Sequence, residues 1–109
     1  MEEYQKMLEL QELLNTALAE FKTRGINYAK AYKNYRIALA QELLKLRDEG
    51  MPVTIAYDIA RGNELVANYK EQEIITEALY KSSQEAINSY KLQIKILQEQ
   101  INKEYNKGV

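Results

Sequence analysis

The first half of the chain carries apolar side chains at every third or fourth position, which is the spacing of one face of an α-helix. Thr23 and Gly25, both weak helix formers, interrupt this stripe, and it resumes at Tyr28. The pattern therefore predicts two helices, over about residues 3–23 and 27–48, with a break at Gly25.

The only proline of the chain follows the second of these predicted helices. Gly50 suits the position just past a helix end, and Pro52 keeps Met51 out of the helical conformation. Thr54 can cap a helix that follows, and we expect that short helix over about residues 55–61. The alternating apolar side chains there also fit a short strand, but no partner strand is visible.

The helical pattern continues without interruption over about residues 64–105, after Gly62 and Asn63 supply a helix end and a new N-cap. An apolar stripe with a seven-residue repeat runs along its C-terminal part, as in coiled coils. The members of this stripe, which we predict to form an oligomer interface, are Leu79, Tyr80, Ile87, Tyr90, Ile94, Leu97 and Ile101.

The predicted C-terminal helix would be about 60 Å long, which is more than a compact domain of this size needs. We therefore expect a second copy of the chain along its apolar stripe. The alternative is a monomeric three-helix bundle, in which the two preceding helices cover the stripe.

These elements predict an all-α fold, a helical hairpin or bundle with one long C-terminal helix that forms a coiled-coil-like homo-oligomer. A chain of 109 residues can bury one core of ordinary size but not two. We therefore expect a single helical domain over residues 1–109.

The composition excludes several classes of function. The chain has no Cys and no His, so it lacks disulfides, thiol nucleophiles, the usual zinc ligands and the imidazole base of many enzymes. Its 15 basic and 16 acidic residues give a net charge of -1, which favours neither DNA nor an acidic membrane as the partner. Two acids follow the first Met in place of a basic secretion signal, and no apolar run could span a membrane. We expect a cytoplasmic protein that is not an enzyme and uses no cofactor.

Three glutamates, Glu71, Glu73 and Glu77, form an acidic patch on the long predicted helix. The di-metal sites of helical bundles combine such glutamates with histidine, which this chain lacks. We therefore expect a solvated acidic face and no metal site.

A basic and aromatic segment without any acid lies between Glu20 and Glu42. Its cations can bind phosphate and its rings can stack on bases, so it is a candidate ligand-binding surface. The candidate residues are Tyr28, Lys30, Tyr32, Lys33, Tyr35 and Arg36. The alternative is that the tyrosines are core residues and that the cations pair with the acid-rich N-terminal helix.

A second candidate ligand site lies where the short helix meets the long one. Tyr57, Arg61 and Asn63 could form a small anion site there, because loops and helix N-termini present polar groups to ligands. The alternative is structural: Asn63 caps a helix, and Asp58 pairs with Arg61 one turn away.

Four stretches of the sequence, over residues 46–54, 58–62, 85–92 and 97–101, carry a resemblance to a known group of proteins. Over roughly residues 29–105 the chain resembles small helical early or accessory proteins of phages and prophages of low-GC Gram-positive bacteria. This resemblance implies action inside a bacterial host cell, either in phage DNA replication or recombination or against a host defence pathway.

The sequence thus leaves several functions open. The first is a non-enzymatic oligomer that binds and sequesters, or inhibits, a host protein or a nucleotide-like signal. The second is an accessory DNA-binding factor, against which the nearly neutral net charge counts. The third is a structural coiled-coil scaffold.

Overall fold

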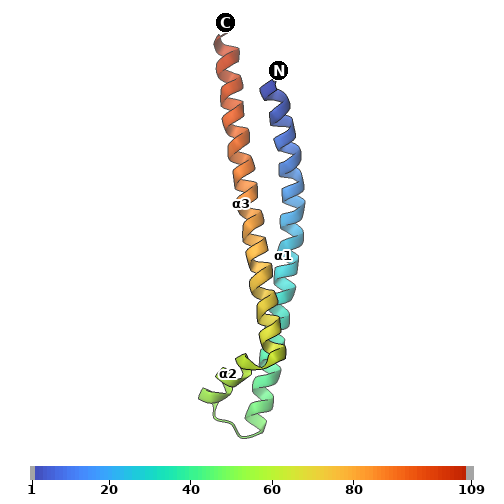
Figure 1. Ribbon diagram of the computed structural model, residues 1–109, viewed down its shortest axis with the longest axis vertical. Helices are drawn as coiled ribbons and strands as arrows, with labels where there is room; N and C mark the ends of the chain where they lie inside the picture. Colours follow the sequence, from blue (N-terminus) through green and yellow to red (C-terminus); the bar gives the residue numbers. More distant parts are fainter. Residues whose placement is uncertain (1, 108–109) are drawn as a thin grey trace. The chain divides into compact units, whose positions relative to one another are not determined.

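The computed structural model describes residues 2–107, and within them the chain forms three helices and no strand. These are α1 (Glu2–Asp48), α2 (Val53–Gly62) and α3 (Glu64–Lys107) (Figure 1). The predicted all-α fold and the long C-terminal helix are confirmed.

The helix break predicted at Gly25 is wrong, because α1 is a single helix of 47 residues in which Gly25 keeps the helical conformation. Gly25 has a packing role instead. A Cβ atom added there would lie 3.0 Å from Cε1 of the Tyr80 ring. The missing side chain therefore lets α3 approach α1 closely, and this contact outweighs the low helix propensity of glycine.

The end of α1 follows the local rules for a helix C-terminus. Gly50 has a φ of 90°, in the left-handed region that glycine adopts without strain. Its N–H donates to the Arg47 carbonyl at 2.9 Å, and the Met51 N–H donates to the Leu46 carbonyl at 3.1 Å. These two bonds form a Schellman motif, which satisfies carbonyls that the helix itself leaves unpaired.

The ends of α2 differ in part from the prediction. The helix begins at Val53, Pro52 occupies the N-cap position, and no side chain caps it, so the predicted cap at Thr54 is wrong. The Pro52 carbonyl accepts from the N–H groups of Ile55 and Ala56 at 3.1 and 2.9 Å, so the first turn already closes before Thr54 could cap it. The predicted N-cap of α3 is confirmed: Asn63 Oδ1 accepts from the Val66 N–H at 3.2 Å.

The contacts of the chain divide it into two compact units. Within the described residues, unit 1 comprises residues 2–23 and 81–107, and unit 2 comprises Arg24–Tyr80. In unit 1 the N-terminal part of α1 and the C-terminal part of α3 run side by side and antiparallel (Figure 1).

Unit 1 is held together by a seam of alternating three- and four-residue steps on both helices, the repeat of a coiled coil. Leu10 and Ala17 of α1 are buried there, as are Ser83 and Ile87 of α3. The remaining inward positions are half-buried: Met7, Leu14, Phe21, Tyr90, Ile94, Leu97 and Ile101. Over residues 87–101 the apolar stripe of α3 thus packs against α1 of the same chain.

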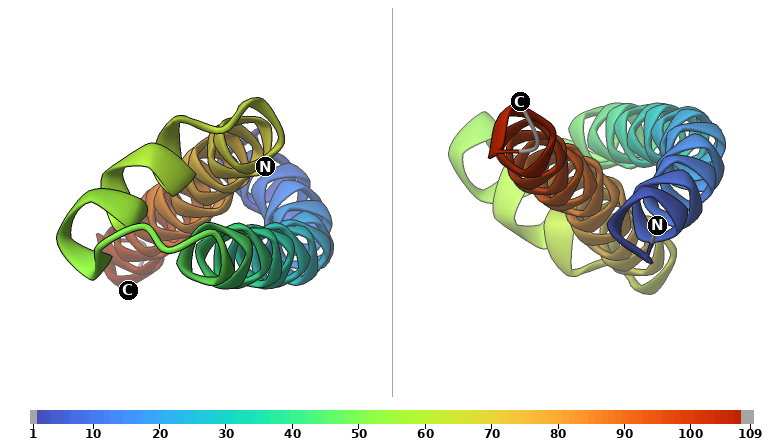
Figure 2. Two further views of the ribbon diagram at one scale, coloured as in Figure 1. Left: turned by 90° about the horizontal axis from the view of Figure 1, so that it is seen from below. Right: turned by 90° about the horizontal axis from the view of Figure 1, so that it is seen from above.

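Unit 2 has a fuller core, to which all three helices contribute. The buried residues are Tyr35, Ala38, Leu39 and Leu46 of α1, Ala56 and Ala60 of α2, and Val66 of α3. Ala56 and Ala60 are both 0% exposed, and their small side chains let α2 lie close alongside the α1 and α3 segments of this unit (Figure 2).

Candidate binding cleft

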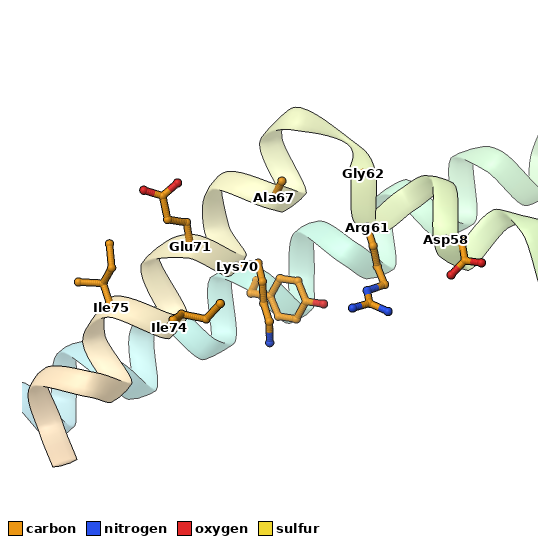
Figure 3. A pocket seen from close by; sticks show the side chains of 9 residues that line it. Asp58, Arg61, Gly62, Ala67, Lys70, Glu71, Ile74 and Ile75 are labelled. Atoms are coloured by element: carbon orange, nitrogen blue, oxygen red, sulfur yellow. The ribbon is translucent and has the colours of Figure 1, made fainter.

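Unit 2 contains an open cleft of about 470 Å³, to which all three helices contribute. One wall comes from α3, where Ala67, Lys70, Glu71 and Ile74 follow the i, i+3, i+4, i+7 spacing of one helix face. The C-terminal end of α2 supplies Asp58, Arg61 and Gly62 (Figure 3). Tyr35 of α1 and Ile75 of α3 complete the lining.

The apolar part of the cleft is accessible to solvent. Ile74 is 57% exposed, and Ile75 is also exposed. Exposed isoleucines inside a concave surface lose unfavourable contact with water when an apolar group covers them. The cleft is therefore able to bind an apolar surface.

Lys70 is held on one side of the cleft by two contacts. Its Nζ donates to Glu73 Oε2 at 3.2 Å, and the same atom lies 4.7 Å from the centre of the Tyr35 ring. Glu73 is only 6% exposed, so the ion pair compensates a carboxylate that would otherwise be buried without a counter-charge. This arrangement fixes Lys70 and the Tyr35 ring relative to each other.

Arg61 lies on the α2 side, with its guanidinium 5.6 Å from the centre of the Tyr57 ring. A cation at this distance over an aromatic face is weakly attracted to it. The alternative prediction of an Asp58–Arg61 ion pair is wrong for the described residues, in which neither side chain makes a hydrogen bond or an ion pair. Both charges thus stay available to a ligand.

The cleft carries charges of both signs. Arg61 and Lys70 are basic and Asp58 and Glu71 are acidic, but Lys70 is already paired with Glu73, so the remaining charge is negative. The described residues contain no cluster of three or more potential metal ligands. The arrangement suits a ligand with apolar groups and charges of both signs better than one that is purely anionic.

The structure brings together only part of the predicted ligand-binding set. Tyr35 and Arg61 line the cleft, and Tyr57 contacts Arg61, whereas Asn63 is occupied as the N-cap of α3. Tyr28 packs against Tyr80 of the same unit, with ring centres 5.9 Å apart. The remaining predicted residues lie exposed on α1 outside the cleft lining: Lys30, Tyr32, Lys33 and Arg36.

Sequence reasoning missed Ala67, Lys70 and Ile74 as cleft residues. Their helical spacing was visible in the sequence, but it also fitted an ordinary solvated face. This face becomes part of a cleft because α2 lies beside it, and the position of α2 depends on packing between segments that are distant in the sequence.

The residues of the predicted oligomer interface on α3 differ in how far they are buried. Ile87 is buried, and Tyr80, Tyr90, Ile94, Leu97 and Ile101 are half-buried, while Leu79 is 45% exposed and its carbonyl accepts from Arg24 Nη1 at 3.1 Å. In unit 1 a groove of about 250 Å³ is lined by three apolar residues, Leu10, Ile96 and Leu97, and by three polar ones, Lys6, Gln93 and Gln100. The packing of α1 thus accounts for the burial of this stripe within one chain.

Comparisons with known protein families, with curated proteins and with solved structures return no match. Among the described helices, none has an apolar stretch long enough to cross a membrane. The likeness to phage proteins remains a hypothesis that rests on the sequence stretches quoted above.

Proposed function

We propose that this chain is a non-enzymatic binding protein that sequesters or inhibits a host protein, whose apolar and charged segment it binds in the cleft of unit 2. The observation that carries the proposal is the exposed Ile74 and Ile75 in a cleft whose rim bears charges of both signs. Protein interfaces combine these features, with apolar residues at the centre and polar residues at the edge.

The balance of charge supports a protein segment over a nucleotide. A phosphate group would meet Arg61 but also Asp58 and Glu71, and Lys70 is already engaged by Glu73. Small-molecule sites also bury most of the surface of their ligand, which an open cleft does not. A partner helix or loop, by contrast, needs only one covered face.

The residue types of the cleft support binding rather than catalysis. Its lining holds no Ser or Thr, and its Lys70 is fixed by an ion pair and by the Tyr35 ring. The chain as a whole lacks His and Cys, the residues that most often supply a base or a nucleophile.

Photo-crosslinking in bacterial cells tests this proposal. A photoreactive phenylalanine derivative replaces Ile74, and in a matched control it replaces Leu92, which is 58% exposed in unit 1. We expect one protein to crosslink from position 74 only, and Arg61→Glu to reduce its yield because the rim charge is reversed.

The captured protein must then bind the purified chain, with an affinity that Arg61→Glu lowers at least about tenfold. The same products from both positions, or no product from position 74, would contradict the proposal. Titration calorimetry with the purified partner supplies the affinity.

A nucleotide-like ligand is the second candidate, because Arg61 lies over the exposed Tyr57 ring at the edge of the cleft. A base could stack on that ring while the guanidinium binds a phosphate. Thermal unfolding in the presence of linear and cyclic nucleotides tests it. A rise in melting temperature that Arg61→Ala abolishes would support it, and no shift with any nucleotide would remove it.

A further inference from the structure

The cleft of unit 2 suits only some of the modes by which proteins bind peptide segments. The described residues contain no strand, so a partner segment has no sheet edge to which it could add a strand. Proline-rich segments bind grooves lined by aromatic rings, but Tyr35 is the only aromatic residue of the described lining, and Lys70 lies over its ring. The remaining common mode that uses an apolar surface is a helix laid along the cleft.

The walls of the cleft suit a helix. The lining residues of α3 follow one helix face over about two turns, from Ala67 to Ile74, and side chains at this spacing form ridges between which those of a second helix pack. Gly62, at the end of α2, has no atom within 4 Å of its Cβ position, and Ala67 has a small side chain, so a partner backbone can approach closely. The exposed Ile74 and Ile75 then supply the apolar contact.

The free charges of the cleft indicate the charge of the partner. Because Lys70 is paired with Glu73, Arg61 is the one cation left in the described lining. It faces two carboxylates, Asp58 of α2 and Glu71 of α3, neither of which has an ion pair within the described residues (Figure 3). Since complementary charges favour association, a matching helix has basic side chains on both flanks of its apolar stripe and an acidic one opposite Arg61.

We propose that the partner segment is an amphipathic helix that carries more basic than acidic residues beside its apolar stripe. It lies along the α3 wall, with apolar side chains on Ile74 and Ile75 and basic ones near Asp58 and Glu71. This inference rests on the proposed function, because it names the kind of host segment that the cleft binds. Acidic or phosphorylated segments are not expected to bind, since clusters of arginine recognise them and the cleft offers only Arg61 beside two acids.

Two designed helical peptides test the charge of the partner. They share one apolar stripe of Leu and Ala, with the spacing i, i+3, i+4 and i+7, and Lys and Glu exchange places on its flanks, so that one peptide is basic and the other acidic. We expect the basic peptide to bind the full chain at least about tenfold more tightly, measured by fluorescence anisotropy. Equal affinities, tighter binding of the acidic peptide, or no binding of either would overturn the proposal.

Neutral variants locate the effect on the protein. Asp58→Asn together with Glu71→Gln should remove most of the preference for the basic peptide. Glu85→Gln together with Glu99→Gln, at exposed positions of unit 1, changes the net charge of the chain equally and should leave the preference intact. Circular dichroism establishes that each variant keeps its helical content. An equal loss in both double variants would show that the general charge of the chain selects the peptide, which would also overturn the proposal.

A third peptide tests whether the partner must be helical. It has the basic sequence with a proline at its centre, which breaks a helix without changing the charge. We expect its affinity to be at least about tenfold lower. Undiminished binding would show that a helix is not required.

The proposed function and this inference can fail separately. Mass spectrometry of the product crosslinked at position 74 identifies the bound segment, and an acidic segment of a host protein would overturn this inference while the proposed function stands. If the basic peptide binds but no host protein crosslinks in cells, the proposed function fails while the preference of the cleft for a basic helix stands. A segment from a second copy of this chain would overturn both.

Discussion

The two units of this chain use the same pair of helices but differ in what they leave exposed. Unit 1 has only α1 and α3, and most of their inward apolar side chains lie in the seam, beside a groove that apolar and polar residues line equally. Unit 2 adds α2, which needs only Ala56 and Ala60 for attachment and so keeps its isoleucines on the surface. The short helix α2 thus adds a cleft and an apolar outer face to the pair that α1 and α3 form in this unit.

The largest effect is expected where α2 attaches. Ala60→Asp places a charge without a partner at a position that is 0% exposed, and we expect a loss of about 3 to 5 kcal/mol of unfolding free energy. Ala40→Asp, on the exposed side of α1, is the matched control and should cost less than about 1 kcal/mol. Urea unfolding followed by circular dichroism measures both, and equal losses would show that α2 is not anchored through Ala60.

A cavity in the seam of unit 1 should have a smaller effect. Ile87→Ala removes a buried side chain, and we expect a loss of about 2 kcal/mol, because a two-helix core can partly collapse around the gap. Ile96→Ala, at a half-exposed position of the same helix, should cost less than about 1 kcal/mol.

Hydrogen exchange locates the effect of Ile87→Ala. Faster exchange should be confined to residues 2–23 and 81–107 if unit 1 opens by itself. Equal acceleration over residues 24–80 would show that the two units unfold together and would weaken the comparison between them.

The close packing of the Tyr80 ring on Gly25 can be tested within unit 2. Gly25→Leu forces the Tyr80 ring away from its position 3.0 Å from the added Cβ, and we expect a loss of about 1 to 3 kcal/mol. Gly62→Ala is the matched control, because no atom lies within 4 Å of its Cβ, and it should stabilise the chain by up to about 1 kcal/mol. Thermal unfolding of both variants checks the sign, and a stable Gly25→Leu variant would contradict the packing role.

The smallest effect is expected at the junction between α2 and α3. Asn63→Ala removes the side-chain oxygen that accepts from the Val66 N–H, and we expect a loss of about 1 kcal/mol. Asn63→Asp keeps an acceptor and adds a favourable charge at the helix N-terminus, so it should match the wild type. If both variants lower the melting temperature equally, the capping hydrogen bond does not explain how Asn63 contributes to stability.

The parts of the fold that depend on residues adjacent in the sequence were predictable. The left-handed Gly50 and the Asn63 cap follow from local backbone chemistry, and both were expected at these positions. The predicted helix break at Gly25 was wrong because packing against Tyr80 outweighs the low helix propensity of glycine. The predicted cap at Thr54 was wrong because the Pro52 carbonyl already closes the first turn of α2.

The candidate site was only partly predictable for a related reason. Tyr35 and Arg61 were identified by residue type, and both line the cleft. Lys70 and Ile74 were not identified, because their part in the cleft depends on where α2 lies. The apolar outer face of α2 likewise became visible only when burial separated Ala56 and Ala60 from Ile55 and Ile59.

The sequence by itself determined the helical character of the chain, the end of α1, the start of α3 and the repeat of the apolar stripe along α3. Only the tertiary structure decided what covers that stripe. The hydrophobic effect is non-directional, so an apolar stripe specifies that a helix must cover it but not which chain supplies the helix. A helix of the same chain is present at high effective concentration, and in unit 1 it is α1 that packs on the stripe over residues 87–101.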